Sequence, residues 1–364
     1  CTLNLGENLN VTGSGTLLAT KDSTSSIGSK FNVEKDNIGI IASFNKDEEH
    51  GLTLTSKGSL NLVGDNAKGI YAKSVKSKAK IVNSGEIVTS KDSKNLKNTI
   101  GIYSDNVKVE NTGVIKANTG IYITNESNVD NTGKIELVGE SSRGILGVGI
   151  KNEAILNIGQ ITGEEKGQKG IYLENNDKKL TLNNANITLS GDSSYGIVIK
   201  NDVNKEFLVT NSEIKVANDG VGIYSKKTSG DIKNTNITLN KSKVGLAVEG
   251  EDTILNFEGT IKEKENTTGS KLVYAKDNAK VNLSVTELKV TKDGLGLGVD
   301  NATINTAKET TITVNGGTGA YINHNGSISD KFKIDVQNGL GLYIQNGYNG
   351  TLPTVSLTGD NSKA

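Results

Sequence analysis

Tyrosine is the residue whose placement first suggests chemistry in this chain. The chain has 10 tyrosines, and eight of them stand at the third position of a recurring Gly-Ile-Tyr segment. These eight are Tyr71, Tyr103, Tyr122, Tyr172, Tyr224, Tyr274, Tyr321 and Tyr343. Tyrosine is favoured in binding patches because its flat apolar ring carries a polar hydroxyl. The column therefore predicts a surface for sugar rings or for a flat protein surface. Stacked tyrosines also stabilise neighbouring strands, an interpretation that needs no ligand.

Acid–base and metal chemistry has few candidates. Cleavage of polysaccharides needs clustered carboxylates, often with Ca²⁺, and a nearby basic residue. The basic candidates His50, Arg143 and His324 lie far apart along the chain, and acidic pairs are scattered at Glu48/Glu49, Glu164/Glu165 and Glu251/Asp252. The sequence has no Cys or His cluster and no calcium-loop motif. We therefore expect no catalytic residues, no metal and no cofactor.

The tyrosines belong to a repeat that extends along most of the chain. The glycine of the Gly-Ile-Tyr segment recurs about every 25 residues from Gly39 to Gly341, in about thirteen copies. One copy, around Lys271, keeps the remainder as "LVYA" without the glycine. We expect Lys271 at the glycine position of that copy and Leu272 at the apolar second position.

Each repeat contains up to three short strands with alternating residues. The second and fourth residues of the Gly-Ile-Tyr strand are apolar or small, as in Ile102 and Ser104, and are expected to point inward. A strand before the next glycine alternates in the same way, as in Ile312 and Val314. Helical repeats need longer runs at 3.6 spacing, and the leucine-rich pattern is not met. The sequence predicts an all-β, right-handed parallel β-helix, because parallel crossovers are right-handed.

Asparagine marks one corner of this coil. Asn83, Asn111, Asn131, Asn157 and Asn183 each stand four residues before an inward Ile. Like residues in successive coils lie about 4.8 Å apart and form ladders through their side-chain amides. We expect these five asparagines to form a structural ladder, which slips one place at Asn211 and Asn234.

Composition excludes several classes of protein. The chain has 364 residues, 41 basic and 41 acidic side chains, 43 Gly, 1 Pro and no Met. Balanced charge without a basic stripe argues against nucleic acid, and no apolar run approaches the ~20 residues of a membrane helix. Cys1 is the only cysteine, which excludes a disulfide scaffold. It is either a lipid-anchored mature end or simply the place where the segment begins.

We expect one β-helix domain over 1–364, with less regular coils in 1–38 and regular coils in 39–364. The segment "TVSLTGDNSKA" (354–364) resembles "SLNLVGDNAKGIYA" (59–72), and no cap is visible, so the chain is expected to be a monomeric fragment of a longer protein. Length differences between coils fall in turns that are a further candidate binding surface. These turns are expected at 45–50, 91–98, 201–206, 262–269, 323–331 and 345–350.

Repeated "GIY" strands, "NTG" corners, a vocabulary rich in Lys, Asn and Ile, and near absence of Cys, Trp and Pro resemble the passenger domains of the large fusobacterial type V autotransporter adhesins. The resemblance covers the whole chain in repeat style and supplies no ligand motif. It implies a C-terminal β-barrel outside this chain and display on the bacterial outer membrane. It also implies adhesion to host cells, glycans or other bacteria. A β-helical carbohydrate-active enzyme and a surface stalk without a ligand remain alternatives.

Overall fold

The chain forms a parallel β-solenoid of about 14 turns with about 24 residues per turn. The computed structural model describes residues 2–6, 10–11, 15–45, 52–75, 79–90, 95–348 and 350–364. Over these residues all elements are strands, and none is a helix that could span a membrane. The predicted fold class is confirmed.

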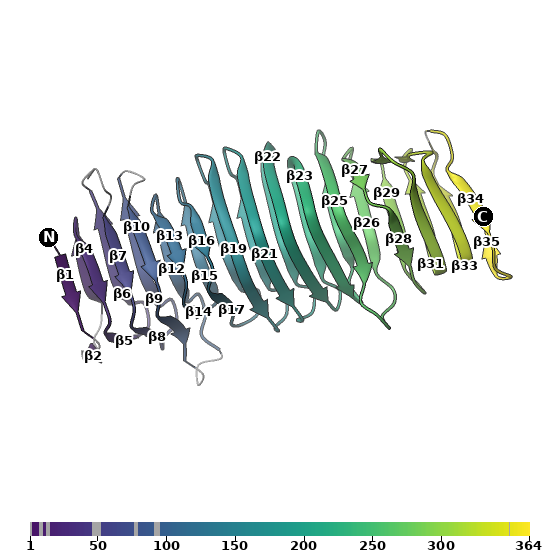
Figure 1. Cartoon of the computed structure of the whole chain (residues 1–364). Coiled ribbons are helices and arrows are strands. Elements are labelled where there is room, and N and C mark those ends of the chain that lie inside the picture. The colour runs from purple at the N-terminus through teal and green to yellow at the C-terminus, as the bar shows by residue number, and fades with distance from the viewer. Residues whose placement is uncertain are drawn as a thin grey trace. The chain divides into compact units, whose positions relative to one another are not determined.

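The solenoid comprises two compact units, Cys1–Ile187 and Thr188–Ala364. Within each unit, successive coils place equivalent strands side by side and parallel (Figure 1). Each coil contributes to three faces, and the face built from Gly-Ile-Tyr segments is called the tyrosine face. The strands that follow it in each coil form the second face and then the third face.

The first unit is built mainly from short, separate strands. Its tyrosine face consists of β3 (Thr16–Lys21), β6 (Ile38–Phe44), β9 (Lys68–Ser74), β12 (Ile100–Asp105), β15 (Thr119–Thr124), β18 (Arg143–Val148) and β20 (Lys169–Glu174). Its second face consists of β1 (Thr2–Leu5), β4 (Thr24–Ile27), β7 (Thr53–Ser56), β10 (Lys80–Asn83), β13 (Lys108–Asn111) and β16 (Val129–Asn131). Its third face consists of β2 (Asn10–Val11), β5 (Lys30–Val33), β8 (Ser59–Leu62), β11 (Glu86–Thr89), β14 (Val114–Ala117) and β17 (Lys134–Leu137). The last coils use longer strands that turn from the second face to the third, β19 (Ala154–Gly163) and β21 (Leu180–Leu189).

The second unit has longer strands, several of which continue from one face to the next. These long strands are β22 (Tyr195–Ala217), β23 (Val221–Asn240), β25 (Ile254–Glu263), β31 (Thr310–Asn323) and β33 (Phe332–Gln345). The tyrosine face also contains β24 (Val244–Glu249), β26 (Lys271–Lys276), β29 (Leu295–Asp300) and β35 (Ser362–Lys363). The other two faces are completed by β27 (Lys280–Ser284), β28 (Glu287–Val290), β30 (Thr303–Thr306), β32 (Ser327–Ile328) and β34 (Thr354–Leu357).

The core lies inside the coils and consists of stacked apolar side chains. Ile102 and Ser104 are fully buried, as are Ile312 and Val314, so the predicted alternation is confirmed. Near the C-terminus the second position becomes half-buried at Leu342, because little of the next coil covers it. All five phenylalanines of the chain point inward and are at most 2% exposed. They are Phe31, Phe44, Phe207, Phe257 and Phe332.

Glycine opens the tyrosine-face strand because successive backbones approach closely there. A Cβ on Gly101 would lie 2.6 Å from the carbonyl oxygen of Gly120 in the next coil and 2.4 Å from a methyl group of Ile115. In the copy that lacks glycine, the expected register is wrong by one residue. Val273 pairs with Leu246 in β24, so Leu272 takes the buried glycine position and Lys271 stands before it.

The asparagine ladder is confirmed for three of its five expected members. Asn83 donates from its Nδ2 to Asn111 Oδ1 at 2.7 Å, and Asn111 donates to Asn131 Oδ1 at 2.6 Å. All three side chains are buried inside the coil, so each amide satisfies the next.

Asn157 and Asn183 do not continue this buried ladder. Asn157 pairs in register with the outward Asp130, while Ile158 takes the inward place beside Asn131. In this coil Gly159, with φ 59°, makes the corner. The corner shifts the alternation of inward and outward side chains by one residue, so Ile158 points inward and Asn157 does not. Asn183 and Asn157 form a separate half-buried contact at 3.2 Å.

In the second unit, asparagines with left-handed backbone conformation make the corner. Asn211 and Asn234 have φ of 50° and 48°, and the Nδ2 of Asn234 lies 3.4 Å from Asn211 Oδ1 on the exposed surface. The predicted slip at these two residues is confirmed.

The expected variable turns have mixed outcomes. Residues 201–206 do not form a turn but belong to the continuous strand β22, with a register shift between Lys200 and Lys205 that absorbs the insertion. Residues 264–269 do lie outside strands. The turn at 323–331 is interrupted by β32. Residues 46–50, 91–94 and 349, and with them His50 and Glu48/Glu49, lie outside the described residues, as does Cys1.

Candidate functional site

The eight predicted tyrosines all project from the tyrosine face, at equivalent places in its strands. Within the first unit, Tyr103 pairs with Tyr71 and with Tyr122 in the neighbouring coils. Within the second unit, Tyr321 pairs with Tyr343. Seven of the eight are half-buried by their neighbours, and Tyr343 is 47% exposed. The outward column expected from the sequence is therefore present.

In the first unit three tyrosines in consecutive coils form a closed stack. The rings of Tyr71 and Tyr103 are parallel to within 1°, with centroids 4.7 Å apart, and Tyr122 meets Tyr103 edge-on at 5.0 Å. Burial, together with the neighbouring Tyr71 and Asp105, raises the pKa of Tyr103 to about 12. Neighbouring rings pack against one another, so the ring surfaces that meet within the stack are covered.

Tyr172 stands apart from this stack, with Leu146 in the coil between it and Tyr122. Its hydroxyl donates to Glu174 Oε2 at 3.0 Å, and the guanidinium carbon of Arg143 lies 5.5 Å from its ring centroid. Arg143, which the sequence offered as a basic catalytic candidate, is therefore a cation–π partner of a surface tyrosine.

In the second unit the tyrosine column is interrupted at every second coil from Tyr224 to Tyr321, and Tyr343 follows Tyr321 without a gap. Ala247 stands between Tyr224 and Tyr274, and Gly298 stands between Tyr274 and Tyr321. Successive tyrosines are thus two strand spacings apart, about 9.6 Å. The Tyr274 ring leans over Gly298, since a Cβ there would lie 2.3 Å from Cδ2 of that ring.

These interruptions leave grooves beside the rings. A groove of about 560 Å³ is lined by Lys271, Tyr274, Asp293, Gly294, Leu295, Thr318, Tyr321, Leu340 and Tyr343. A second groove of about 350 Å³ adjoins Tyr195, Tyr224, Ala247 and Tyr274. Tyr321 and Tyr343 stack at 5.6 Å, and the Tyr321 hydroxyl donates to Gln345 Oε1 at 2.7 Å. The second unit therefore has accessible ring surface with polar groups around it.

Tyr195 is a site residue that sequence reasoning missed. It stands directly before Gly196, and its ring meets Tyr224 edge-on at 6.4 Å. Lys271 precedes Leu272, the glycine equivalent, in the same way, and its Nζ lies 5.9 Å from the Tyr274 centroid. Residues before the glycine share the outward side of the strand with the tyrosines, so a search at that position could have found both.

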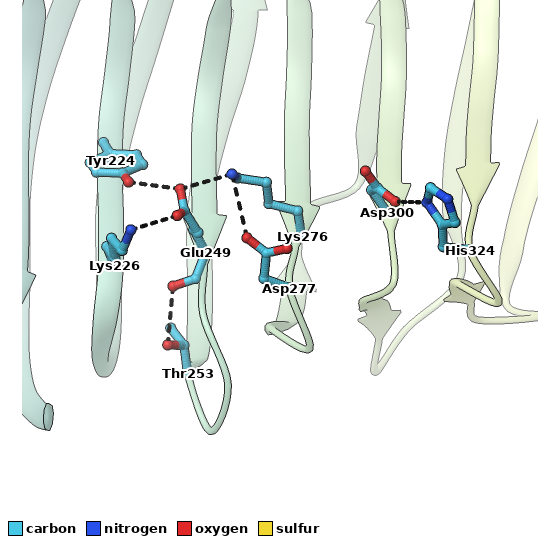
Figure 2. Close-up of polar contacts among 8 residues, drawn as sticks. All are labelled: Tyr224, Lys226, Glu249, Thr253, Lys276, Asp277, Asp300 and His324. Carbon is cyan, nitrogen blue, oxygen red and sulfur yellow. Dashed lines mark hydrogen bonds and ion pairs between the residues drawn. The ribbon is translucent and has the colours of Figure 1, made fainter. Parts of the chain in front are cut away.

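One carboxylate organises the polar surface beside Tyr224 (Figure 2). Glu249 accepts a hydrogen bond from the Tyr224 hydroxyl at 2.8 Å and pairs with Lys226 at 2.7 Å and Lys276 at 3.2 Å. Burial opposes ionisation of Glu249, but these hydrogen bonds and charges outweigh it and hold its pKa below the usual value. Burial, and then the bond to Glu249, raise the pKa of Tyr224. Lys226 and Lys276 therefore both pair with Glu249, a carboxylate of the protein itself.

His324 has one acidic partner and no second one in the described residues. Its Nδ1 lies 2.6 Å from Asp300 Oδ1, and the His324 side chain is 60% exposed (Figure 2). Asn323 contributes its Nδ2 to the same carboxylate at 3.3 Å. This arrangement is an exposed surface pair beyond the end of the tyrosine strand.

The remaining acidic candidates do not converge either. The Glu165 carboxylate accepts a hydrogen bond from the backbone N–H of Gly139 at 3.0 Å, and Glu251 and Asp252 lie in an exposed turn. Among the described residues, no group of three His, Cys, Asp or Glu is placed to hold a metal ion.

Comparison with protein-family models, curated proteins and solved structures gives no match to this chain. The tyrosine face and its surroundings are therefore the features of the molecule that indicate a function.

Proposed function

We propose that this chain is a segment of a bacterial cell-surface adhesin that attaches to host cells, surface glycans or other bacteria through the tyrosine face of its second unit. The observation that carries the proposal is the interruption of the tyrosine column at Ala247 and Gly298. It leaves ring faces open beside grooves on one side of a regular scaffold.

The fold is compatible with this role. Within each unit, successive coils stack on one another, and the repeated strands present one face over several coils. Large apolar side chains occupy the interior, so surface residues can vary without loss of the core. The repeat style that resembles fusobacterial autotransporter passengers supports display at the outer-membrane surface.

Binding of the purified chain to epithelial cells and to other bacteria tests the proposal. Tyr274→Ala/Tyr321→Ala removes two rings that line the 560 Å³ groove and should lower bound protein at least about fivefold, since central aromatic residues dominate binding energy. Tyr71→Ala/Tyr122→Ala is the matched control in the closed stack and should retain binding. Circular dichroism checks that both proteins fold.

Equal adherence of all three proteins would contradict the proposed site, and absence of adherence by the unaltered chain would favour a stalk. The stalk is the second candidate, because the stacked tyrosines and the buried asparagines of the first unit hold successive coils together, as a rigid spacer requires. The chain is not proposed to be an enzyme, and release of reducing ends or unsaturated products from polysaccharides would overturn that view.

A further inference from the structure

Lys271 lies at the centre of the grooves of the second unit. It lines the 560 Å³ groove with Tyr274 and Tyr321. It also lines the groove beside Tyr195 and Tyr224. A third groove, of about 740 Å³, adds Lys241 and Lys243 to Lys271 and Tyr195. The shared residues make these grooves one continuous surface, which we call the lysine–tyrosine surface.

The charges of these three lysines are not neutralised by the protein. The side chains of Lys241, Lys243 and Lys271 are exposed, and among the described residues none has an acidic group within ion-pairing distance. Asp219 and Asp293 line the same surface but do not approach the lysines closely enough to pair. Among the residues that line these grooves, three lysines without an ion pair therefore stand against two aspartates.

Other lysines of the same unit behave differently. Lys226 and Lys276 both pair with Glu249, and Lys289 pairs with Glu287 at 3.3 Å. What distinguishes Lys241, Lys243 and Lys271 is that they gather without a recorded ion pair on one surface that also carries tyrosine rings. Such unpaired cations favour a ligand that brings its own negative charge.

The spacing of the rings favours a saccharide over a peptide. Tyr224, Tyr274 and Tyr321 recur at two strand spacings, about 9.6 Å. Side chains on one side of an extended peptide repeat at about 6.7 Å and would fall out of step with these rings. Alternate sugar rings of an extended β-linked polysaccharide are separated by a distance comparable to two coils, and the C–H face of a pyranose packs well on tyrosine.

We propose that the lysine–tyrosine surface binds a linear acidic polysaccharide in which every second sugar carries a carboxylate or a sulfate. Tyr274 and Tyr321 carry pyranose rings, and Lys243 and Lys271 pair with the acidic groups. This inference rests on the proposed adhesive function and names the ligand class for the same face.

Direct binding to defined polysaccharides tests the inference. The probes are a polymer alternating glucuronate with N-acetylglucosamine, its carboxyl-reduced neutral form, and a polymer alternating galactose with 6-sulfated N-acetylglucosamine, whose only acidic groups are sulfates. Each is titrated into the full chain by calorimetry at 50 and 300 mM NaCl. The acidic polymers should bind, the reduced polymer should bind at least about tenfold more weakly, and the higher salt should weaken binding because it screens exposed charges. Comparison of the two acidic polymers distinguishes carboxylate from sulfate recognition.

The variant that isolates the charge is Lys243→Gln/Lys271→Gln, which removes both charges and keeps a polar, hydrogen-bonding side chain at each position. It should lose about tenfold in affinity for the acidic polymer and lose most of the salt dependence. Lys289→Gln is the control from the same unit, on the third face, and should bind like the unaltered chain. Circular dichroism and the melting temperature confirm that both variants fold.

Equal affinity for the acidic and reduced polymers, or unchanged affinity in the double lysine variant, would overturn the inference. Tight binding of single-stranded oligo-dT through the same lysines would overturn it in favour of nucleic acid. Adherence to cells that persists without binding to any acidic polymer would sink this inference and leave the adhesin proposal intact. Absence of adherence to any cell would instead count against the adhesin proposal.

Discussion

The two units use the same repeat position for different purposes. In the first unit, Tyr71, Tyr103 and Tyr122 occupy consecutive coils and cover one another's rings. In the second unit, Ala247 and Gly298 separate the tyrosines, so ring surface and cations remain accessible. Rings in adjacent coils are one strand spacing apart and touch, whereas rings in alternate coils are two spacings apart and leave a gap. A small residue in place of tyrosine in every second coil therefore converts a stabilising stack of rings into a surface that can bind a ligand.

The largest expected effect distinguishes the two roles of glycine. Gly101→Ala should lower the free energy of unfolding by about 3 kcal/mol, since its Cβ meets a backbone oxygen that cannot move without shifting a coil. The Cβ of Gly298→Ala meets side chains alone, those of Tyr274 and Leu295, which can change rotamer, and the variant should cost less than about 1 kcal/mol. Urea unfolding followed by circular dichroism measures both variants. Similar costs would show that close backbone contact does not explain the glycine column.

A somewhat smaller effect is expected from the asparagine ladders. Asn111→Ala removes the middle of the buried ladder and leaves Asn83 and Asn131 with unpaired amide groups, which should cost about 2 kcal/mol. In the second unit Asn256, Asn282 and Asn305 form a ladder on the outer surface, and Asn282→Ala there should cost less than about 0.5 kcal/mol because water replaces the lost partners. Hydrogen exchange near each site provides the measurement. A large cost at Asn282 would contradict the distinction between buried and exposed ladders.

Filling the gap at Gly298 in the tyrosine face of the second unit should weaken binding of the acidic polysaccharide. Gly298→Tyr places a ring between Tyr274 and Tyr321 and makes the second unit resemble the closed stack of the first. Affinity for an acidic polysaccharide should fall at least about tenfold, equivalent to about 1.4 kcal/mol, while the melting temperature stays within a few degrees. Gly298→Ala serves as the control and should keep more of the affinity. Undiminished binding by the Tyr variant would show that the open ring faces are not the site.

The smallest effect concerns alkaline pH in the first unit. Because burial raises the pKa of Tyr103 from 10.0 to about 12 in the folded chain, the folded state holds this proton more tightly than the unfolded state. The resulting stability is present below pH 10 and is lost as the pH rises toward 12. Tyr103→Phe should make the fall in urea midpoint over this range shallower. An unchanged slope would contradict the role assigned to the Tyr103 hydroxyl.

Sequence periodicity predicted the strands of the tyrosine face, their inward residues and the outward tyrosines, because alternation along one strand is a local property. The prediction was wrong where the register of a strand shifts by one residue or where an insertion is absorbed within a strand. The register at Lys271 and Leu272 differs by one residue from expectation, and Asn157 turns outward behind the left-handed Gly159. Residues 201–206, expected as a turn, continue a strand. Each error concerns how an insertion or a corner is absorbed, which depends on the coil against which the segment packs.

The sequence alone thus determined which side chains of each strand face the core and which face solvent, since that follows from residue type and a period of two. Only the tertiary structure decided which residues become neighbours between coils: that Tyr274 leans over Gly298, that Tyr195 joins Tyr224, and that Lys271 borders three grooves. The physical reason is that coils differ in length, so contacts between residues more than twenty positions apart are set by backbone stacking rather than by spacing along the chain.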